Sequence, residues 1–177
     1  MAFLKKRIKA IAGALLAAVA WALAAHAEAP MLEYQVKASY LYNFARFITW
    51  PEDVVARQGN FNLCIVGAER FGSALDALAG ERVNGQTIAL HRLEQAGQAR
   101  ANRCHLLFIA SGRDGTATGG PERGLLTIGE TPGFLERGGI INLVEVNGRI
   151  RFEIRQPAAR QAGLVVSSQL LGLAIQR

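Results

Sequence analysis

The sequence predicts a single-domain α/β protein with a Rossmann-like three-layer fold around a mixed sheet. Three short apolar runs, at residues 61–66, 104–110 and 125–129, are typical of buried parallel strands because they lack a regular polar alternation. Helical or crossover segments separate the runs, as in a parallel α/β core. An Asn147-Gly148 pair between two later strands adds a C-terminal β-hairpin to that core.

The first element of this domain is predicted to be a helix over residues 32–48. Apolar residues recur at helical spacing from Val36 through Phe47, and Lys37 is placed with the polar side chains on the opposite side. Trp50-Pro51 ends the helix, because proline disfavours α geometry at the residue before it.

Shorter elements are expected between the apolar runs. In order, they are a helix at 71–79 capped by Gly80, a turn at Asn84-Gly85, a strand at 87–93, a polar stretch of helical character at 94–103, a Gly- and Thr-rich loop at 111–124 and a helical turn from Thr131-Pro132 to Gly138. A loop of this length can make a parallel crossover. It would leave one sheet face with less cover, which could serve a partner or a homodimer contact.

The hairpin strands differ in their patterns. The first strand, INLVEV, is apolar on both sides, whereas the second alternates strictly and is therefore predicted to lie near the sheet edge. One side of the second strand carries Arg149, Arg151, Glu153 and Arg155. This stripe has two interpretations, a charged guard against edge-to-edge pairing or a protein contact. Two short helices, around 158–161 and 168–175, complete the chain.

Residues 1–27 are predicted to be a cleaved secretory signal peptide. Four basic residues at positions 5, 6, 7 and 9 precede an uncharged run over residues 10–25, and Ala25 and Ala27 form a small-residue cleavage site. The run is shorter than the roughly 20 residues that a spanning helix needs, so an uncleaved anchor is the weaker alternative. We expect a periplasmic domain at residues 28–177 that does not span a membrane after cleavage.

The net charge of +6 would by itself suggest a nucleic-acid partner. The four basic residues of the leader account for most of it, and the remaining chain has 16 basic against 14 acidic residues. The charge therefore marks an export signal, and nucleic acid is not an expected partner.

Cys64 and Cys104 both lie in predicted buried strands. An even number of cysteines in an oxidising compartment favours a disulfide, and closing a loop of about 40 residues would stabilise the fold by about 4 kcal/mol. Two free buried thiols are the alternative. Their spacing is not the C-x-x-C of thioredoxin-like redox sites.

No assembled catalytic, cofactor or metal site is evident in the sequence. Gly67 and Gly72 have the spacing of a phosphate loop, but Ser-Ala follows them where Lys-Ser/Thr is required. No G-x-S-x-G elbow surrounds a serine, and His91 and His105 lack a zinc-ligand spacing to a second cysteine. We therefore expect no enzymatic activity, no cofactor and no metal.

A small-molecule site is the alternative function that the residues suggest. Gly67, Ser111 and Glu130 each follow a predicted strand directly, and α/β folds bind ligands at this carboxyl edge of the sheet. Glu130 alone also fits an exposed loop carboxylate. This hypothesis describes a periplasmic accessory or sensor protein of a signalling or transport system.

Two segments resemble a known family. YQVKASYLYNFARFITWP, residues 34–51, resembles the opening helix of the YfiR-like family of periplasmic proteins. GGIINLVEVNGRIRFEI followed by AARQAGLVVSSQLLGLA, within residues 138–174, resembles that family's closing section. FNLCIVG, CHLLFIAS and LLTIGETPGF fit between them in order, so the resemblance covers nearly all of residues 28–177.

The resemblance implies a non-catalytic periplasmic regulator with a Rossmann-like fold. Such proteins bind and repress an inner-membrane signalling enzyme through its periplasmic domain, a diguanylate cyclase in cyclic di-GMP and biofilm control or, by extension, a histidine kinase. An outer-membrane lipoprotein that sequesters the repressor is a further implied partner.

The resemblance also bears on individual residues. Cys64 and Cys104 match family positions that form an intramolecular disulfide, and Arg151, Glu153 and Leu164 lie in the closing section associated with partner binding. The chain departs from the family in two ways. Residues 140–152 lack the second cysteine pair of some members, and the loop at 111–124 replaces a helix.

Overall fold

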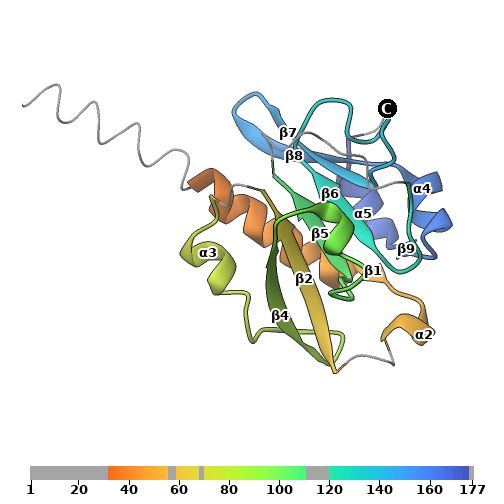
Figure 1. Ribbon diagram of the computed structural model, residues 1–177. Helices are drawn as coiled ribbons and strands as arrows, with labels where there is room; N and C mark the ends of the chain where they lie inside the picture. The colour runs from red at the N-terminus through yellow and green to blue at the C-terminus, as the bar shows by residue number, and fades with distance from the viewer. Residues whose placement is uncertain (1–31, 56–58, 68–69, 111–119, 176–177) are drawn as a thin grey trace, which may run out of the picture.

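The computed structural model describes residues 32–55, 59–67, 70–110 and 120–175. Figure 1 shows a curled seven-stranded sheet with one long helix, residues 32–47, across one face. The strand order is β3-β4-β2-β5-β6-β7-β8. The strands are β2 (Asn60–Val66), β3 (Arg82–Val83), β4 (Gln86–Leu93), β5 (Leu106–Ile109), β6 (Leu126–Gly129), β7 (Ile141–Val146) and β8 (Arg149–Ile154).

The sheet is mixed, as predicted. Strands β4, β2, β5, β6 and β7 run parallel to one another, and β3 and β8 pair antiparallel at the two edges. The predicted hairpin is confirmed, since β7 and β8 are joined through Asn147 and Gly148, both at positive φ. Strand β8 lies at the sheet edge, as its alternating pattern indicated.

The remaining helices are short. They are α2 (Glu52–Val55), α3 (Ser73–Asp76), the 3-10 helix η1 (Ala96–Gln98), α4 (Gln156–Gln161) and α5 (Ser168–Leu173). The helices expected at 71–79 and 94–103 are shorter than predicted, since only α3 and η1 with their flanking turns form there. The segment from Thr131 to Gly138 is a series of turns, because Gly133 and Gly138 adopt positive φ.

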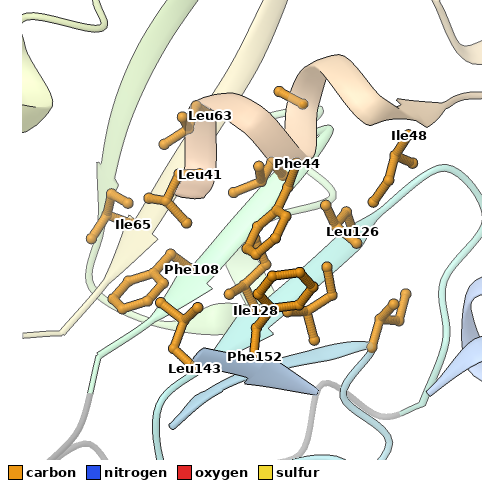
Figure 2. Packing of buried hydrophobic residues seen from close by; sticks show 14 of the residues in the cluster. Leu41, Phe44, Ile48, Leu63, Ile65, Phe108, Leu126, Ile128, Leu143 and Phe152 are labelled. Carbon is orange, nitrogen blue, oxygen red and sulfur yellow. The ribbon is translucent and has the colours of Figure 1, made fainter. Parts of the chain in front are cut away.

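One sheet face packs on the long helix. Leu41 and Phe44 point from the helix into a row of sheet side chains that includes Phe108, Ile128 and Phe152 (Figure 2). All five side chains are fully buried. This face forms the larger hydrophobic core of the described residues.

The other face has a smaller core around Cys64 and Leu107. Phe134 and Leu135, from the turns after β6, and Ala99, from the end of η1, cover it. In the described residues, turns and a 3-10 helix thus take the place of a second helical layer. The mixed sheet is confirmed, while helices on both faces stay a prediction.

The long helix is rotated relative to the sequence prediction. Val36 and Phe47, which were assigned to the apolar side, are 39% and 37% exposed, and Lys37, which was assigned to the polar side, is 5% exposed. Leu41, Phe44 and Ile48, which were also assigned to the apolar side, are buried as predicted. The prediction rested on the positions of the apolar residues alone. Lys37 is buried because its ammonium forms an ion pair with the carboxylate of Glu130.

The opening and closing segments of the domain pack against each other. After the long helix, β1 (Ile48–Thr49) pairs with β9 (Val165–Val166) in a small antiparallel sheet. The Tyr40 hydroxyl donates a hydrogen bond to the Ile150 carbonyl, 3.1 Å away, and Phe44 contacts Phe152 edge to face. The two segments that resemble one family therefore form one structural unit.

Candidate functional site

Glu130 is the centre of a buried polar cluster at the carboxyl edge of the sheet. It directly follows β6, and its side chain is only 4% exposed. Lys37 Nζ lies 2.6 Å from Glu130 Oε2, and the Tyr34 hydroxyl donates to Oε1 across 3.1 Å. The interpretation of Glu130 as an exposed loop carboxylate is therefore wrong.

Lys37 joins this cluster to the first turns of the long helix. Its ammonium also pairs with Glu33, one helical turn earlier, and lies 4.4 Å from the centroid of the Tyr34 ring. Burial alone lowers the pKa of a lysine, but the hydrogen bonds that the ammonium donates to Glu130 and Glu33 outweigh it here and raise the pKa of Lys37 above its usual value. Lys37 is therefore charged at neutral pH, and its charge is compensated.

Tyr34 completes the cluster as a hydrogen-bond donor. Burial and then the negative charge of Glu130 raise the pKa of the Tyr34 hydroxyl above its ordinary value. The phenol therefore stays protonated at neutral pH and holds the Glu130 carboxylate in place. Its ring packs edge to face on Phe71, with the centroids 5.0 Å apart, which fixes the donor.

An open pocket of about 500 Å³ lies over this cluster. Its polar lining includes Arg70 and Glu145 at the surface and Asn142 inside, while Pro132, Leu143 and Ile150 supply apolar wall. Among the described residues, Asn142 Oδ1 is buried and has no hydrogen-bond partner. The pocket therefore combines a neutralised ion pair with an unused acceptor and an exposed cation.

The structure thus tests part of the predicted ligand edge. Glu130 lines the pocket, whereas Gly67, at a φ of 106°, forms the turn after β2 and is not part of the lining. Ser111 lies outside the described residues.

Sequence reasoning missed most of the residues around Glu130. Lys37 was placed on the polar side of its helix, although a Glu four residues before a Lys is a recognised pairing signal. The polar Asn142 in an otherwise apolar strand start was a second available signal. No local pattern could have indicated Tyr34 or Arg70, because only the fold brings them to this edge.

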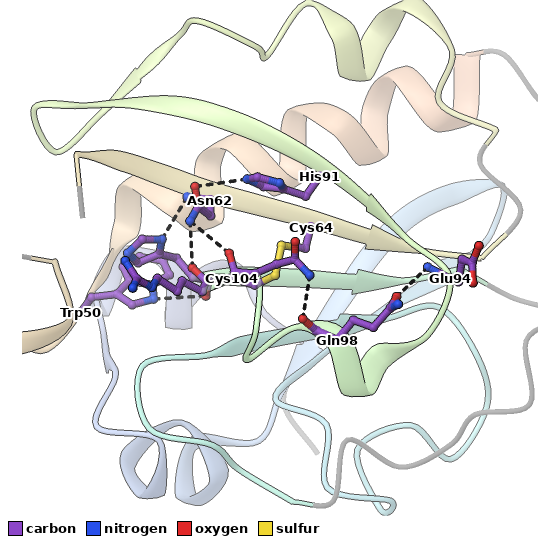
Figure 3. Close-up of a disulfide and its surroundings, with 10 residues drawn as sticks. Trp50, Asn62, Cys64, His91, Glu94, Gln98 and Cys104 are labelled. Carbon is purple, nitrogen blue, oxygen red and sulfur yellow. Dashed lines mark hydrogen bonds between the residues drawn. A yellow bond between two sulfur atoms is a disulfide. The ribbon is translucent and has the colours of Figure 1, made fainter. Parts of the chain in front are cut away.

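The predicted disulfide is present. It joins Cys64 on β2 to Cys104 just before β5, with their Cα atoms 5.9 Å apart (Figure 3). The alternative of free buried thiols is therefore wrong. The Asn62 amide group donates to the carbonyls of Asn102 and Arg103 and so fixes the segment before Cys104.

A buried histidine follows the disulfide. His105 is fully buried and stacks on Phe61, and its Nδ1 accepts a hydrogen bond from the Asn62 backbone N–H at 2.9 Å. Burial lowers the pKa of His105 to about 4, so the ring is neutral at physiological pH. Its Nε2 has no partner among the described residues. The role supported is structural.

The three candidate partner-binding residues have different environments. Arg151 is exposed, whereas Glu153 is 8% exposed and Leu164 is 1% exposed. Leu164 belongs to the main core, so it holds β9 in place and is inaccessible to a partner in this conformation. Of the three, Arg151 is the side chain that a partner can contact directly.

The free edge of β8 is partly closed. The Ile175 N–H donates to the Phe152 carbonyl at 2.9 Å, and Glu153 bridges to Ile175 as a short parallel pair. The Tyr40 hydroxyl also donates a hydrogen bond to a backbone carbonyl of β8, that of Ile150. These contacts protect the edge from pairing with another strand, so a partner meets side chains here more readily than backbone.

In the described part of the chain, no helix has the length and apolar composition needed to cross a bilayer. Within the same residues, no group of three or more His, Cys, Asp or Glu side chains is arranged to hold a metal ion.

The structure defines a small, disulfide-bonded mixed α/β protein with a buried polar cluster at the carboxyl edge of its sheet. The YfiR/HmsC-like family profile matches residues 34–175, and the chain belongs to that family. Members of this family are periplasmic regulators that act with a membrane signalling partner and are regulatory rather than catalytic. A comparison with curated proteins finds no significant match.

Proposed function

We propose that this protein is exported by its N-terminal segment, resides in the periplasm and binds and represses an inner-membrane signalling enzyme. A diguanylate cyclase is the proposed enzyme, and its periplasmic domain is the proposed contact. The observation that carries the proposal is the family match over residues 34–175, which includes both distinctive segments. A histidine kinase is the other membrane partner of suitable class, and an outer-membrane lipoprotein is a proposed sequestering partner.

The surface of the closing section supports a protein contact. Val165 and Leu173 are 65% and 71% exposed, although both are apolar. Arg149 and Arg151 are also exposed, and the described residues show no acidic partner for either. Exposed apolar and arginine side chains are common in interfaces.

Deletion of the gene in its native host tests the proposal. Cellular cyclic di-GMP should rise and biofilm should increase, and expression of the wild-type gene should reverse both changes. An unchanged cyclic di-GMP level would reject repression of a diguanylate cyclase. Purification of the tagged protein from the native envelope, with identification of what it retains, distinguishes the cyclase, the kinase and the lipoprotein.

A matched pair of variants tests the surface. Arg151→Gln should weaken repression, because it removes an exposed charge in the closing section. Arg100→Gln is the control, since Arg100 has an 88% exposed side chain beside η1 and only a 3.9 Å contact with Glu122. Equal repression by both variants would remove Arg151 from the interface. A homodimer contact was the other expected use of the less covered sheet face, and size-exclusion chromatography with light scattering tests it.

A further inference from the structure

The pocket over Glu130 contains polar groups that the fold does not use. Lys37 is engaged by Glu33 and Glu130, and Tyr34 is engaged by Glu130. These four side chains satisfy one another and explain the stability of the pocket floor. Asn142 and Arg70 also line the pocket but take no part in this network.

Asn142 is the first of these groups. Asn142 lies on β7 opposite Gly129 of β6, is 4% exposed and lines the pocket. Its Oδ1 nevertheless has no hydrogen-bond donor among the described residues. Leaving a buried acceptor unsatisfied costs about 1–3 kcal/mol. A leucine would fill similar space without this cost, so the amide suits a ligand that donates to it.

Arg70 is the second group. It is exposed at the pocket rim, and the described residues show no hydrogen bond or ion pair for it. It lies close enough to Tyr34 for its charge to affect the pKa of that hydroxyl. An arginine in this position can bind a carboxylate through two parallel N–H groups.

We propose that this pocket binds a small organic carboxylate that carries a hydrogen-bond donor beside its carboxyl group. Arg70 binds the carboxylate, Asn142 Oδ1 accepts from the neighbouring donor, and the apolar wall of Pro132, Leu143 and Ile150 contacts a hydrocarbon side chain. Both 2-hydroxy acids and α-amino acids have this chemistry. The proposal does not depend on the membrane partner.

Isothermal titration calorimetry with three matched probes tests the proposal on protein purified from the periplasm. The probes are leucine, 2-hydroxy-4-methylpentanoate and 4-methylpentanoate, which share one carbon skeleton and differ only in an ammonium, a hydroxyl or no donor. At least one donor-bearing probe should bind about tenfold or more tightly than 4-methylpentanoate, which corresponds to one hydrogen bond to a buried acceptor. If leucine binds more tightly than 2-hydroxy-4-methylpentanoate, the ligand class is the α-amino acids; if it binds less tightly, the class is the 2-hydroxy acids.

Three variants locate the binding. Asn142→Leu should abolish the preference for the donor-bearing probe, and Arg70→Gln should weaken the binding of all three probes. Arg160→Gln is the control and should leave all three affinities unchanged, because Arg160 is exposed and lies outside the pocket lining. Absence of saturable binding by all three probes would overturn the proposal. So would equal affinity for 4-methylpentanoate, or wild-type binding by both Asn142→Leu and Arg70→Gln.

Discussion

Replacing Lys37 by methionine should destabilise the protein more than any comparable change on the long helix. The substitution keeps the length of the side chain and removes its charge. Glu130 would then keep the Tyr34 hydroxyl as its partner but lose the ammonium 2.6 Å away, in a position where its side chain is 4% exposed. Removing one partner of a buried ion pair costs about 3–5 kcal/mol, because the other charge stays buried.

The opposite substitution should cost less. In Glu130→Gln, Lys37 still has Glu33, whose side chain is 38% exposed and hydrated. The glutamine oxygen can also still accept from Tyr34. We expect a loss of about 1–3 kcal/mol, which corresponds to one charged hydrogen bond. The double variant Lys37→Met/Glu130→Gln should lose less than the sum of the two single variants, because it removes both buried charges together and leaves neither without its partner.

Urea unfolding of the four proteins at pH 7, with the disulfide intact, measures the coupling energy directly. A second measurement near pH 5 adds a test that packing alone would not pass. In Lys37→Met the buried Glu130 carboxylate no longer has the ammonium beside it and binds a proton more readily when folded than when unfolded, so the deficit of this variant relative to wild type should shrink as the pH falls. The deficit of Glu130→Gln should stay about constant over this range, because this variant has no carboxylate at position 130 to bind a proton.

The reasoning would be refuted by additive effects of the two substitutions. It would equally be refuted if Lys37→Met lost less than about 1 kcal/mol, the value typical of exposed ion pairs. Val36→Ala, at the neighbouring 39% exposed position, is the control and should change stability little.

Three further perturbations have expected results. Acidification should destabilise the protein through His105, because the pKa of this residue is about 4 in the folded state and 6.5 in the unfolded state. The stability present above pH 6.5 is lost as the pH falls toward 4. Unfolding titrations over this range should show a loss of about 3 kcal/mol. Replacing Cys64 and Cys104 together by alanine should lower the free energy of unfolding by about 4 kcal/mol, since the bridge closes a loop with a sequence separation of 40. Gly139→Ala should cost about 1–3 kcal/mol, because the added methyl group would overlap the Phe134 ring and lie 2.8 Å from its carbonyl oxygen.

Each of these results has a control. A His105→Gln protein should lose the acid-sensitive step even if it is less stable throughout, and an unchanged pH profile would reject the assignment. Reduction of the wild-type disulfide should reproduce the cysteine variant. Gly97→Ala should be tolerated, because a methyl group there meets no atom within 4 Å; equal losses at both glycines would reject the overlap.

Much of the fold could be predicted from local patterns. Apart from the two-residue β3, the strands from β2 to β8 lie close to the expected ranges. Short apolar runs and the Asn147-Gly148 turn are specified by residues adjacent in sequence, so they can be recognised without the tertiary structure. Helices were harder to place. The segment after Gly72 and the polar stretch around η1 form little helix, because helices this short depend on tertiary packing more than on propensity.

The sequence by itself determined the parallel core and the edge position of β8, because the hydrophobic pattern carries this information. The cysteine count favoured the pairing of Cys64 with Cys104, which the structure then confirmed. Only the tertiary structure decided which polar residues form the candidate site. Lys37 and Glu130 are 93 residues apart in the chain, and burial of their charges is possible only where the helix crosses the carboxyl edge of the sheet. A buried charge is stable when its partner is within bonding distance, and that distance is a property of the fold.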